Sequence, residues 1–288
     1  MAADSSSADG EGRAAARTRL GVLGWPVAHS LSPRIHNAAL AAAGLTGWRY
    51  QLLPVPPDLL AEVVMGLPGA GFRGANVTIP HKEAALALAT RPSQRAAAIG
   101  AANTLIFQGG GEGEVVADNT DAPALIAALP EPVVGASALV LGAGGSARAV
   151  VWALLDAGAV SVAVWNRSPE RARRLCSELG GTPTGTAVAA DVLVNCTSVG
   201  LDGSESLEGL PLDAGDLADY GCIVDLVYRP GGTGLTRAAR AVGRPIVDGL
   251  ELLVGQGALS FEQFTGRGAP VSVMRAAARE PAAHPTGG

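Results

Sequence analysis

Short apolar runs alternate with amphipathic stretches along the first half of the chain. The apolar runs predict strands at residues 19–23, 48–53, 74–79, 103–107 and 115–117. The intervening stretches predict helices from Ser32 to about Ala43, over residues 57–65, from Pro80 to about Ala89 and over residues 121–129. Strands that alternate with helices in this way are typical of an α/β layer with mostly parallel strands.

Turn and cap residues mark the borders of these elements. Ser32 followed by Pro33 predicts an N-cap with proline at the first helical position. Pro80 predicts the start of a helix that carries Lys82 in its first turn. The glycine-rich residues 109–113 lie between two predicted strands and indicate a hairpin.

The pattern becomes more regular in the second half, after a hinge predicted at residues 130–135. Strands are expected at residues 138–141, 161–165, 191–195, 221–226 and 245–247, with a helix from Ser146 to Ala157 after the first of them. In residues 249–264 apolar side chains recur at helical spacing, which predicts a long helix. The chain of 288 residues therefore has the length and the pattern of two α/β domains.

Composition narrows the classes of partner. Hydrophobic residues make up 48% of the chain and charged residues 16%, which indicates a packed globular protein. The net charge of −5 is spread without long runs of one sign, so neither nucleic acid nor a membrane is expected as a partner. No apolar run reaches the ~18 residues of a membrane span. Residues 1–18 and 281–288 lack an apolar pattern and are expected to be disordered tails.

The cysteines and histidines bear on location and metal binding. Cys176, Cys196 and Cys222 are odd in number and show no paired spacing, which favours reduced thiols in a cytoplasmic protein. The four histidines form no recognisable metal-binding cluster, so no metal site is expected.

Lys82 is the only lysine in the chain, whereas the other 20 fixed cations are arginines. A guanidinium keeps its proton, but an ammonium can be tuned by burial and neighbours to give and accept one. A chain that uses arginine wherever a positive charge suffices is therefore expected to use its single lysine for proton chemistry. The alternative is an exposed lysine on a helix turn.

Residues 142–147, GAGGSA, fit the pattern G-x-G-x-x-A between a predicted strand and an amphipathic helix. The first glycine permits a tight turn, the second lets the backbone approach a pyrophosphate, and the small alanine lets helix pack on strand. The start of the helix offers unpaired N–H groups to the phosphates. This context predicts a dinucleotide site formed by Gly142, Ala143, Gly144, Gly145 and Ser146.

The end of the next strand indicates which dinucleotide is bound. An NAD site usually has Asp or Glu there to hold the ribose 2′-hydroxyl, but this chain has Asn166, Arg167 and Ser168. Arg167 and Arg171 can bind a 2′-phosphate through planar, charge-assisted hydrogen bonds, and Asn166 and Ser168 can add neutral ones. We therefore predict NADP, and we expect Arg173 to lie on an ordinary solvated helix face.

A nicotinamide site that reduces a ketone needs a proton donor beside the carbonyl. Lys82 is one candidate, and Asp121, among polar residues just before a predicted helix, is another. Taken alone, Asp121 can equally be interpreted as a helix N-cap.

The motifs together resemble the shikimate dehydrogenase family over nearly all of residues 19–275. They are GWPVAHSLSP (24–33), NVTIPHKE (76–83), AANTL (101–105), DNTD (118–121), the glycine turn, NRS (166–168), NCTSVG (195–200), DLVYRP (225–230) and DGLE (248–251) through Gln256. The resemblance implies NADPH-dependent reduction of 3-dehydroshikimate to shikimate by a monomer or homodimer. It also implies that Lys82 and Asp121 are the catalytic pair.

The resemblance further assigns binding residues. Those for the substrate are Ser30, Ser32, Thr78, Asn103, Asp121, Tyr228 and Gln256, and further ones for NADP are Thr197, Leu226 and Gly249. Hydroxyls and amides suit a small polyhydroxylated acid, because they both donate and accept hydrogen bonds. Each also has a purely structural interpretation: Ser32 as a helix cap, Thr78 as a strand-end cap, Tyr228 as a core aromatic and Asn103 as a turn residue.

The family implies a split substrate domain, an α/β domain of residues 19–120 plus 248–280. A Rossmann-like NADP domain of residues 121–247 is inserted in it, and the substrate cleft lies between the two. The sequence departs from the family in having Ala122 and Pro123 where glycine usually follows Asp121, Leu252 in place of a common Met, and Ser168 in place of a frequent Thr. None of these changes removes a chemical group that the mechanism needs.

Three alternatives remain open from the sequence. A family member that acts on quinate or aminoshikimate would have the same motifs. A non-catalytic NADPH-binding regulator on this fold has no reason to keep Lys82 and Asp121 together. A methylene-tetrahydrofolate dehydrogenase has a similar layout, but the paired Ser30 and Ser32 and the DNTD motif count against it.

Overall fold

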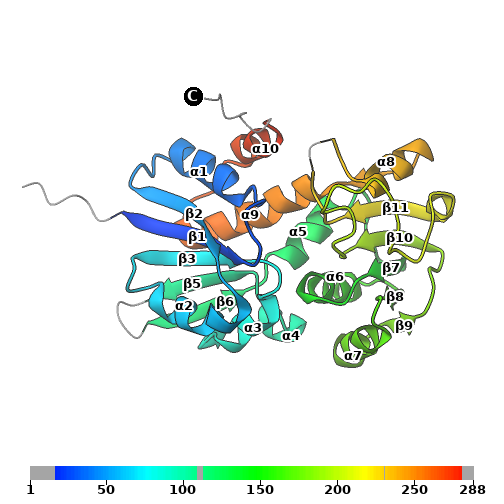
Figure 1. The fold of residues 1–288 in the computed structure, drawn as a ribbon, viewed down its shortest axis with the longest axis horizontal. Coiled ribbons are helices and arrows are strands. Elements are labelled where there is room, and N and C mark those ends of the chain that lie inside the picture. Colours follow the sequence, from blue (N-terminus) through cyan, green and yellow to red (C-terminus); the bar gives the residue numbers. More distant parts are fainter. Residues whose placement is uncertain (1–16, 109–112, 230, 281–288) are drawn as a thin grey trace, which may run out of the picture.

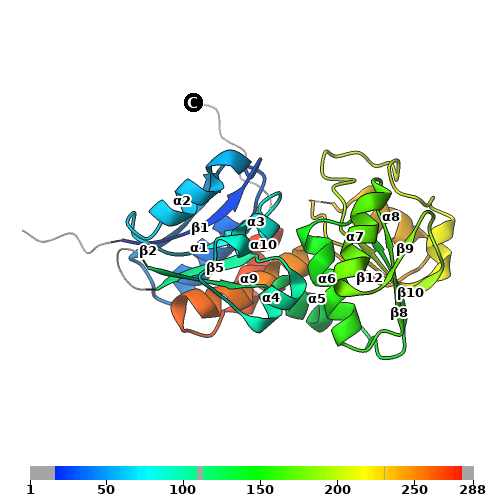
Figure 2. The same cartoon turned by 90° about the horizontal axis from the view of Figure 1, so that it is seen from below.

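The computed structural model describes residues 17–108, 113–229 and 231–280, and these residues form two six-stranded sheets. The strand orders are β2-β1-β3-β5-β6-β4 and β12-β11-β10-β7-β8-β9. The two sheets belong to separate lobes, and helices α5 (Asp121–Ala128) and α9 (Gly249–Thr265) lie between them (Figure 1). Figure 2 shows the same two lobes from below.

The first sheet is mixed but mostly parallel. Its strands are β1 (Thr18–Gly24), β2 (Trp48–Pro54), β3 (Phe72–Val77), β4 (Arg91–Pro92), β5 (Thr104–Gln108) and β6 (Glu114–Asp118). Strand β1 pairs in parallel with β2 and β3, and β4 with β6, whereas β5 is antiparallel to both β3 and β6. The antiparallel β5–β6 pair confirms the predicted hairpin strands, although residues 109–112 of the predicted turn lie outside the described residues.

Side chains alternate between the two faces of the first sheet because successive residues of a strand point to opposite sides. On one face, Leu20 and Val22 pack against α1 (Ser32–Ala42), α9 and α10 (Val271–Arg279). On the other, Leu23 and Ala75 pack against α2 (Leu60–Gly66) and α3 (Lys82–Ala87). A 3₁₀ turn, η1 (Pro57–Leu59), precedes α2, and α4 (Gln94–Ile99) follows β4.

The second sheet is parallel throughout its described pairs. Its strands are β7 (Ser137–Leu141), β8 (Ser161–Trp165), β9 (Thr182–Thr184), β10 (Ala190–Asn195), β11 (Tyr220–Asp225) and β12 (Ile246–Val247). Val140 and Val194 face α6 (Gly145–Asp156) and α7 (Pro169–Leu179), whereas Leu139 and Leu193 face η2 (Asp216–Asp219) and α8 (Gly234–Ala241). The long strands are thus buried on both faces, as is usual for parallel sheets.

Most predicted elements are confirmed within a few residues, with three kinds of difference. Ser32 is not an N-cap: Leu31 holds that position without a side-chain hydrogen bond, and Ser32 and Pro33 begin the helix. Elements β4, β9, α4, α8 and α10 were not predicted. Strand β1 begins at Thr18, inside the predicted tail, while residues 1–16 and 281–288 lie outside the described residues.

In the described part of the chain, every helix is too short or too polar to cross a membrane.

His36 is buried in the core between α1 and the first sheet without a polar partner. Its ring stacks on Tyr50, with ring centroids 4.2 Å apart and planes 7° apart. Neither ring nitrogen has a hydrogen-bond partner among the described residues. Burial lowers the pKa of His36 from its ordinary 6.5 to about 3, because charging the ring here would leave a cation without solvent.

This burial predicts a pH dependence of stability. Below pH 6.5 the unfolded chain gains a proton at His36 that the folded protein does not take up until about pH 3. The free energy of unfolding therefore decreases as the pH is lowered through this window, by up to about 1.4 kcal/mol per pH unit from this group. We expect His36→Phe to remove that contribution, measured by urea unfolding across the window. Equal pH slopes in the two proteins would contradict it.

Candidate active site

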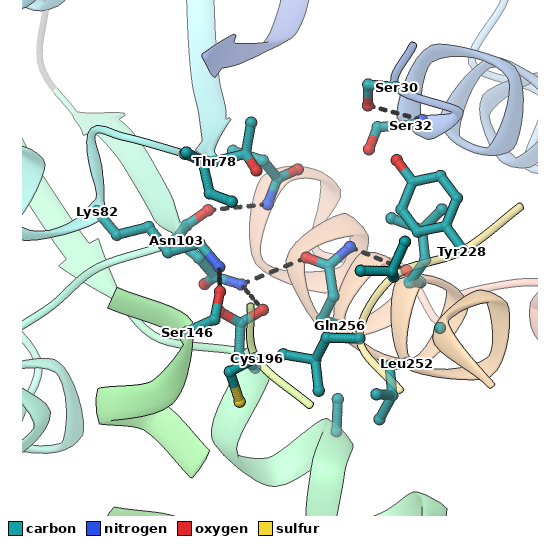
Figure 3. Close-up of a pocket in the computed structure, with 18 of the residues that line it drawn as sticks. Ser30, Ser32, Thr78, Lys82, Asn103, Ser146, Cys196, Tyr228, Leu252 and Gln256 are labelled. Carbon is teal, nitrogen blue, oxygen red and sulfur yellow. Dashed lines mark hydrogen bonds and ion pairs between the residues drawn. The ribbon is translucent and has the colours of Figure 1, made fainter. Parts of the chain in front are cut away.

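Residues from both lobes line one cavity at the carboxyl ends of the central strands. The first lobe contributes Ser30, Ser32, Asn76, Thr78, Lys82, Asn103 and Gln256. The second contributes Ser146, Cys196, Thr197, Leu226 and Tyr228, with Asp121, Gly249 and Leu252 from the ends of α5 and α9. All seven predicted substrate residues and the predicted catalytic pair therefore share this cavity, which Figure 3 shows in close-up.

The ammonium of Lys82 and the carboxylate of Asp121 form an ion pair inside the cavity. Each residue is the first of its helix, α3 and α5, and Lys82 Nζ donates to Asp121 Oδ2 at 2.7 Å. Their side chains are only 10% and 18% exposed. The alternative of an exposed lysine is therefore wrong. Each charge of the pair compensates the other, because removing either side chain would leave an uncompensated charge in a buried place.

Asp121 does not cap its helix. Thr120 occupies the N-cap position, and the side chain that caps the first turn is Asn119, whose Oδ1 accepts from the N–H groups of Asp121 and Ala122 at 3.1 and 3.3 Å. The N-cap interpretation of Asp121 is therefore wrong. Because Asn119 performs the capping, both carboxylate oxygens of Asp121 are available to the cavity.

Asn103 orients the second oxygen of Asp121. Its Oδ1 accepts from the N–H of Thr120 at 2.8 Å, which fixes the amide so that Nδ2 points toward the carboxylate. Nδ2 then donates to Asp121 Oδ1 at 2.8 Å, with Gln256 Oε1 at 3.3 Å. Asn103 is thus more than a turn residue, because it connects the ion pair to Gln256 on α9 (Figure 3).

Three hydroxyl groups meet at the opposite end of the cavity. The backbone N–H of Ser32 donates to Ser30 Oγ at 3.3 Å, and Tyr228 lies across from both serines (Figure 3). Burial raises the pKa of Tyr228, and the hydrogen bond with Ser30 offsets this only in part. The phenol therefore keeps its proton and can donate a hydrogen bond to an anionic group.

Asn76 was not among the predicted site residues, yet it is buried and lines the cavity beside Thr78. Tyr50 donates to Asn76 Oδ1 at 2.8 Å, and Asn76 Nδ2 contacts Thr104 Oγ1 at 3.2 Å. The available signal was its place in the strand: an amide in an apolar buried strand, two residues before Thr78 and hence on the same side.

The glycine turn leaves room for a dinucleotide. Gly142 has φ of 113°, and a β-carbon there would lie 3.1 Å from the carbonyl of Cys196. A β-carbon at Gly144 would meet nothing within 4 Å, and no side chain caps the start of α6. The first N–H groups of this 12-residue helix are therefore open to an anion, which fits a pyrophosphate.

The arginines after β8 divide into two kinds. Arg173 and Arg174 on α7 form exposed pairs with Glu170 and Glu178, so they lie on a solvated face. Among the described residues, Arg167 and Arg171 are exposed and take part in no ion pair. Their guanidinium groups are thus available for an external anion such as a phosphate.

A buried polar network shapes the loop after β10. Asn195 Nδ2 donates to Asp225 Oδ1 at 2.9 Å, and Asn195 Oδ1 accepts from the N–H and hydroxyl of Thr197 at 3.0 and 2.7 Å. Burial raises the pKa of Asp225, and hydrogen bonds from Thr233 and others lower it in part. This network holds Thr197 at the cavity wall.

Cys196 lies in the same wall, and its surroundings favour the neutral thiol. Burial raises the pKa of its thiol far above the ordinary value, and the nearby ammonium of Lys82 opposes this only in part. The nucleophilic thiolate form is therefore disfavoured at Cys196.

A parallel sheet with a glycine turn at a helix start, packed against a buried lysine–carboxylate pair beside a cavity, defines a nucleotide-dependent dehydrogenase of the α/β class. Family sequence models identify it more closely. "Shikimate dehydrogenase substrate binding domain" matches residues 22–105, "Shikimate / quinate 5-dehydrogenase" residues 127–198, and "Shikimate 5'-dehydrogenase C-terminal domain" residues 249–279. The chain belongs to the shikimate dehydrogenase family.

Individual relatives agree with this. The chain is 45% identical over 261 residues to shikimate dehydrogenase (NADP(+)) of Paracoccus denitrificans strain Pd 1222, which covers 86% of the chain and 90% of that protein. The fold of this chain is similar to that of shikimate 5-dehydrogenase of Thermus thermophilus, which was solved in complex with NADP(H) and shikimate. The identity is 43%, the TM-score 0.80, and 91% and 98% of the two chains are covered.

The same fold also occurs in an enzyme named for a different ketone. The ligand-free 5-ketofructose reductase of Gluconobacter sp. strain CHM43 matches with a TM-score of 0.77 at 27% identity, over 91% of this chain and 97% of that one. The fold alone therefore does not identify the substrate, which depends on the residues that line the cavity.

Proposed function

We propose that this protein catalyses the reversible NADPH-dependent reduction of 3-dehydroshikimate to shikimate, a step of aromatic amino acid biosynthesis. The observation that carries the proposal is the 2.7 Å contact between Lys82 and Asp121 inside a cavity lined by hydroxyl and amide groups. The family membership and the NADP(+)-dependent relatives support the same activity.

In the proposed mechanism Lys82 delivers a proton to the developing alkoxide. Bound NADPH would supply the hydride that reduces the C3 ketone. Asp121 Oδ2 holds the ammonium, while Asn103 holds Asp121 Oδ1, so the pair is oriented before the substrate enters. In the direction of shikimate oxidation, the same amine accepts the proton from the hydroxyl.

The remaining substrate contacts follow from the two ends of the cavity. Ser30, Ser32 and the protonated Tyr228 are proposed to hold the substrate carboxylate, since all three can donate hydrogen bonds. Thr78, Asn103 and Gln256, at the Lys82 end, are proposed to bind the ring hydroxyls. A substrate that lacks either the carboxylate or the hydroxyls would leave buried polar groups unpaired, which gives selectivity.

The NADP site is proposed to run along the second lobe. Gly142, Ala143, Gly144, Gly145 and Ser146 would hold the pyrophosphate, and Asn166, Arg167, Ser168 and Arg171 the 2′-phosphate. Thr197, Leu226 and Gly249 line the same cavity as Lys82 and would hold the nicotinamide end. At Gly249, a β-carbon would lie 2.7 Å from the carbonyl of Leu226, so glycine is needed there.

We further propose the domain division given by the family: residues 19–120 with 248–280 for the substrate, and residues 121–247 for NADP. The packing of α9 on the first sheet supports this division. We also propose a cytoplasmic enzyme, since the three cysteines in the described residues are free. Light scattering will distinguish a monomer from a homodimer.

The test is the spectrophotometric rate of NADP⁺ reduction with shikimate, quinate and aminoshikimate as separate substrates. A kcat/KM for shikimate well above the other two is expected. Preference for quinate or aminoshikimate would overturn the choice of substrate but keep the chemistry. No NADP⁺ reduction with any of the three would overturn the enzyme assignment in favour of a binding protein.

A further inference from the structure

The hydroxyl of Ser146 points toward Lys82, the proposed proton donor, and accepts a hydrogen bond from it. Lys82 Nζ donates to Ser146 Oγ at 2.8 Å, a contact that Figure 3 shows. Ser146 lies in the first turn of α6 in the second lobe, whereas Lys82 begins α3 in the first. The two lobes therefore meet at the reacting amine.

Two neighbours of Ser146 keep α6 in this place. A β-carbon at Gly145 would lie 2.7 Å from the β-carbon of Lys82, so glycine lets the helix pack against the lysine stem. Arg148, in the same stretch of α6, has an 8% exposed side chain. Its Nε donates to the carbonyl of Ile99 at the end of α4 at 2.8 Å, and its Nη1 pairs with Glu178 at 2.6 Å.

We propose that Ser146 is a positioning residue for Lys82, an inference that rests on the proposed function. An ammonium has three N–H donors. Asp121 and Ser146 accept two of them, which leaves one for the substrate oxygen. With a single acceptor the ammonium rotates about its partner; with two, the third donor has one direction.

Ser146 therefore belongs to two sites through different atoms. Its backbone N–H is among those at the open start of α6, where the pyrophosphate is expected, and its side chain belongs to the proton donor. Substitution of the side chain separates these roles, because alanine keeps the backbone N–H and loses only the hydroxyl.

The first test observes Lys82 without cofactor, substrate or turnover. Because the chain has one lysine, labelling lysine Nζ with ¹⁵N gives one side-chain NMR signal from the enzyme. In Ser146→Ala the ammonium protons are expected to exchange with water at least about threefold faster, since one acceptor is lost. Ser146→Thr, which keeps a hydroxyl, and Ser161→Ala, at an exposed serine in β8, are expected to match the wild type.

The second test measures turnover in the same proteins. Ser146→Ala is expected to lower kcat roughly five- to tenfold, the scale of one hydrogen bond, with the KM for NADPH within about twofold of wild type. A raised solvent deuterium isotope effect on kcat is expected, because proton delivery becomes slower; Ser146→Thr restores both values.

Two results would overturn the proposal: a Lys82 signal in Ser146→Ala that exchanges as in the wild type, or a raised KM for NADPH with unchanged kcat, which would assign the hydroxyl to the cofactor. A wild-type protein inactive on all three acids would refute the proposed function instead, while the NMR comparison would still test the contact.

Discussion

Lys82→Met is expected to lower kcat at least ~10²-fold, the usual scale for losing an acid–base group. Methionine keeps an unbranched stem of similar length that packs on Gly145 but carries no proton. The KM values for shikimate and NADP⁺ are expected to change much less, because the proposed carboxylate and phosphate contacts lie elsewhere. Steady-state rates of NADP⁺ reduction measure both quantities.

Lys82→Arg serves as the matched control, since it keeps the positive charge beside Asp121 but does not release a proton at ordinary pH. If Lys82 acts by transferring a proton, the arginine variant is expected to be as slow as the methionine variant. Near-normal turnover in Lys82→Met would end the proton-donor role. Recovery in Lys82→Arg alone would show that charge, and not proton transfer, is what the reaction requires.

The sequence indicates the candidate site most strongly where a residue type is chemically unusual for its place. A single lysine in an arginine-rich chain indicates a role that arginine cannot fill, and a dinucleotide turn followed by arginine instead of a carboxylate indicates a phosphate on the ribose. The same argument did not separate the two interpretations of Asp121. The choice between them depends on Asn119, whose side chain caps α5 because of the backbone geometry of the turn.

Contacts between residues far apart in the chain could not be predicted from the sequence, for a physical reason. Asn103 holds Asp121 because β5 pairs with β6, and Gln256 reaches Asn103 because α9 packs on the same sheet. Ser146 accepts from Lys82 because the two lobes meet there. The local sequence around each of these residues does not determine which distant residue it contacts.

Three of the five elements missed in the fold are very short. β4 and β9 are two or three residues long, and α4 six, too short to show a period. Yet α4 does carry local signals, a Ser93 cap and Gly100 in the left-handed conformation at its end.

Arg167→Ala is expected to raise the KM for NADPH by roughly 10- to 100-fold, the range of a lost charge-assisted hydrogen bond to a phosphate. The KM for NADH is expected to stay within about twofold, because NADH carries a 2′-hydroxyl where NADPH carries the phosphate. The physical basis is the free state of this guanidinium: it is exposed and, within the described residues, makes no ion pair. Initial rates with each cofactor at saturating 3-dehydroshikimate measure the ratio.

Arg173→Ala is the matched control, because it removes the same charge from the nearby helix α7. Arg173 is already paired with Glu170, at 2.5 Å on an exposed face, so its loss is expected to leave both KM values unchanged. This comparison separates a specific phosphate contact from a general change in surface charge. If Arg167→Ala weakened NADPH and NADH equally, or if Arg173→Ala had the same effect as Arg167→Ala, the 2′-phosphate site would have to lie elsewhere.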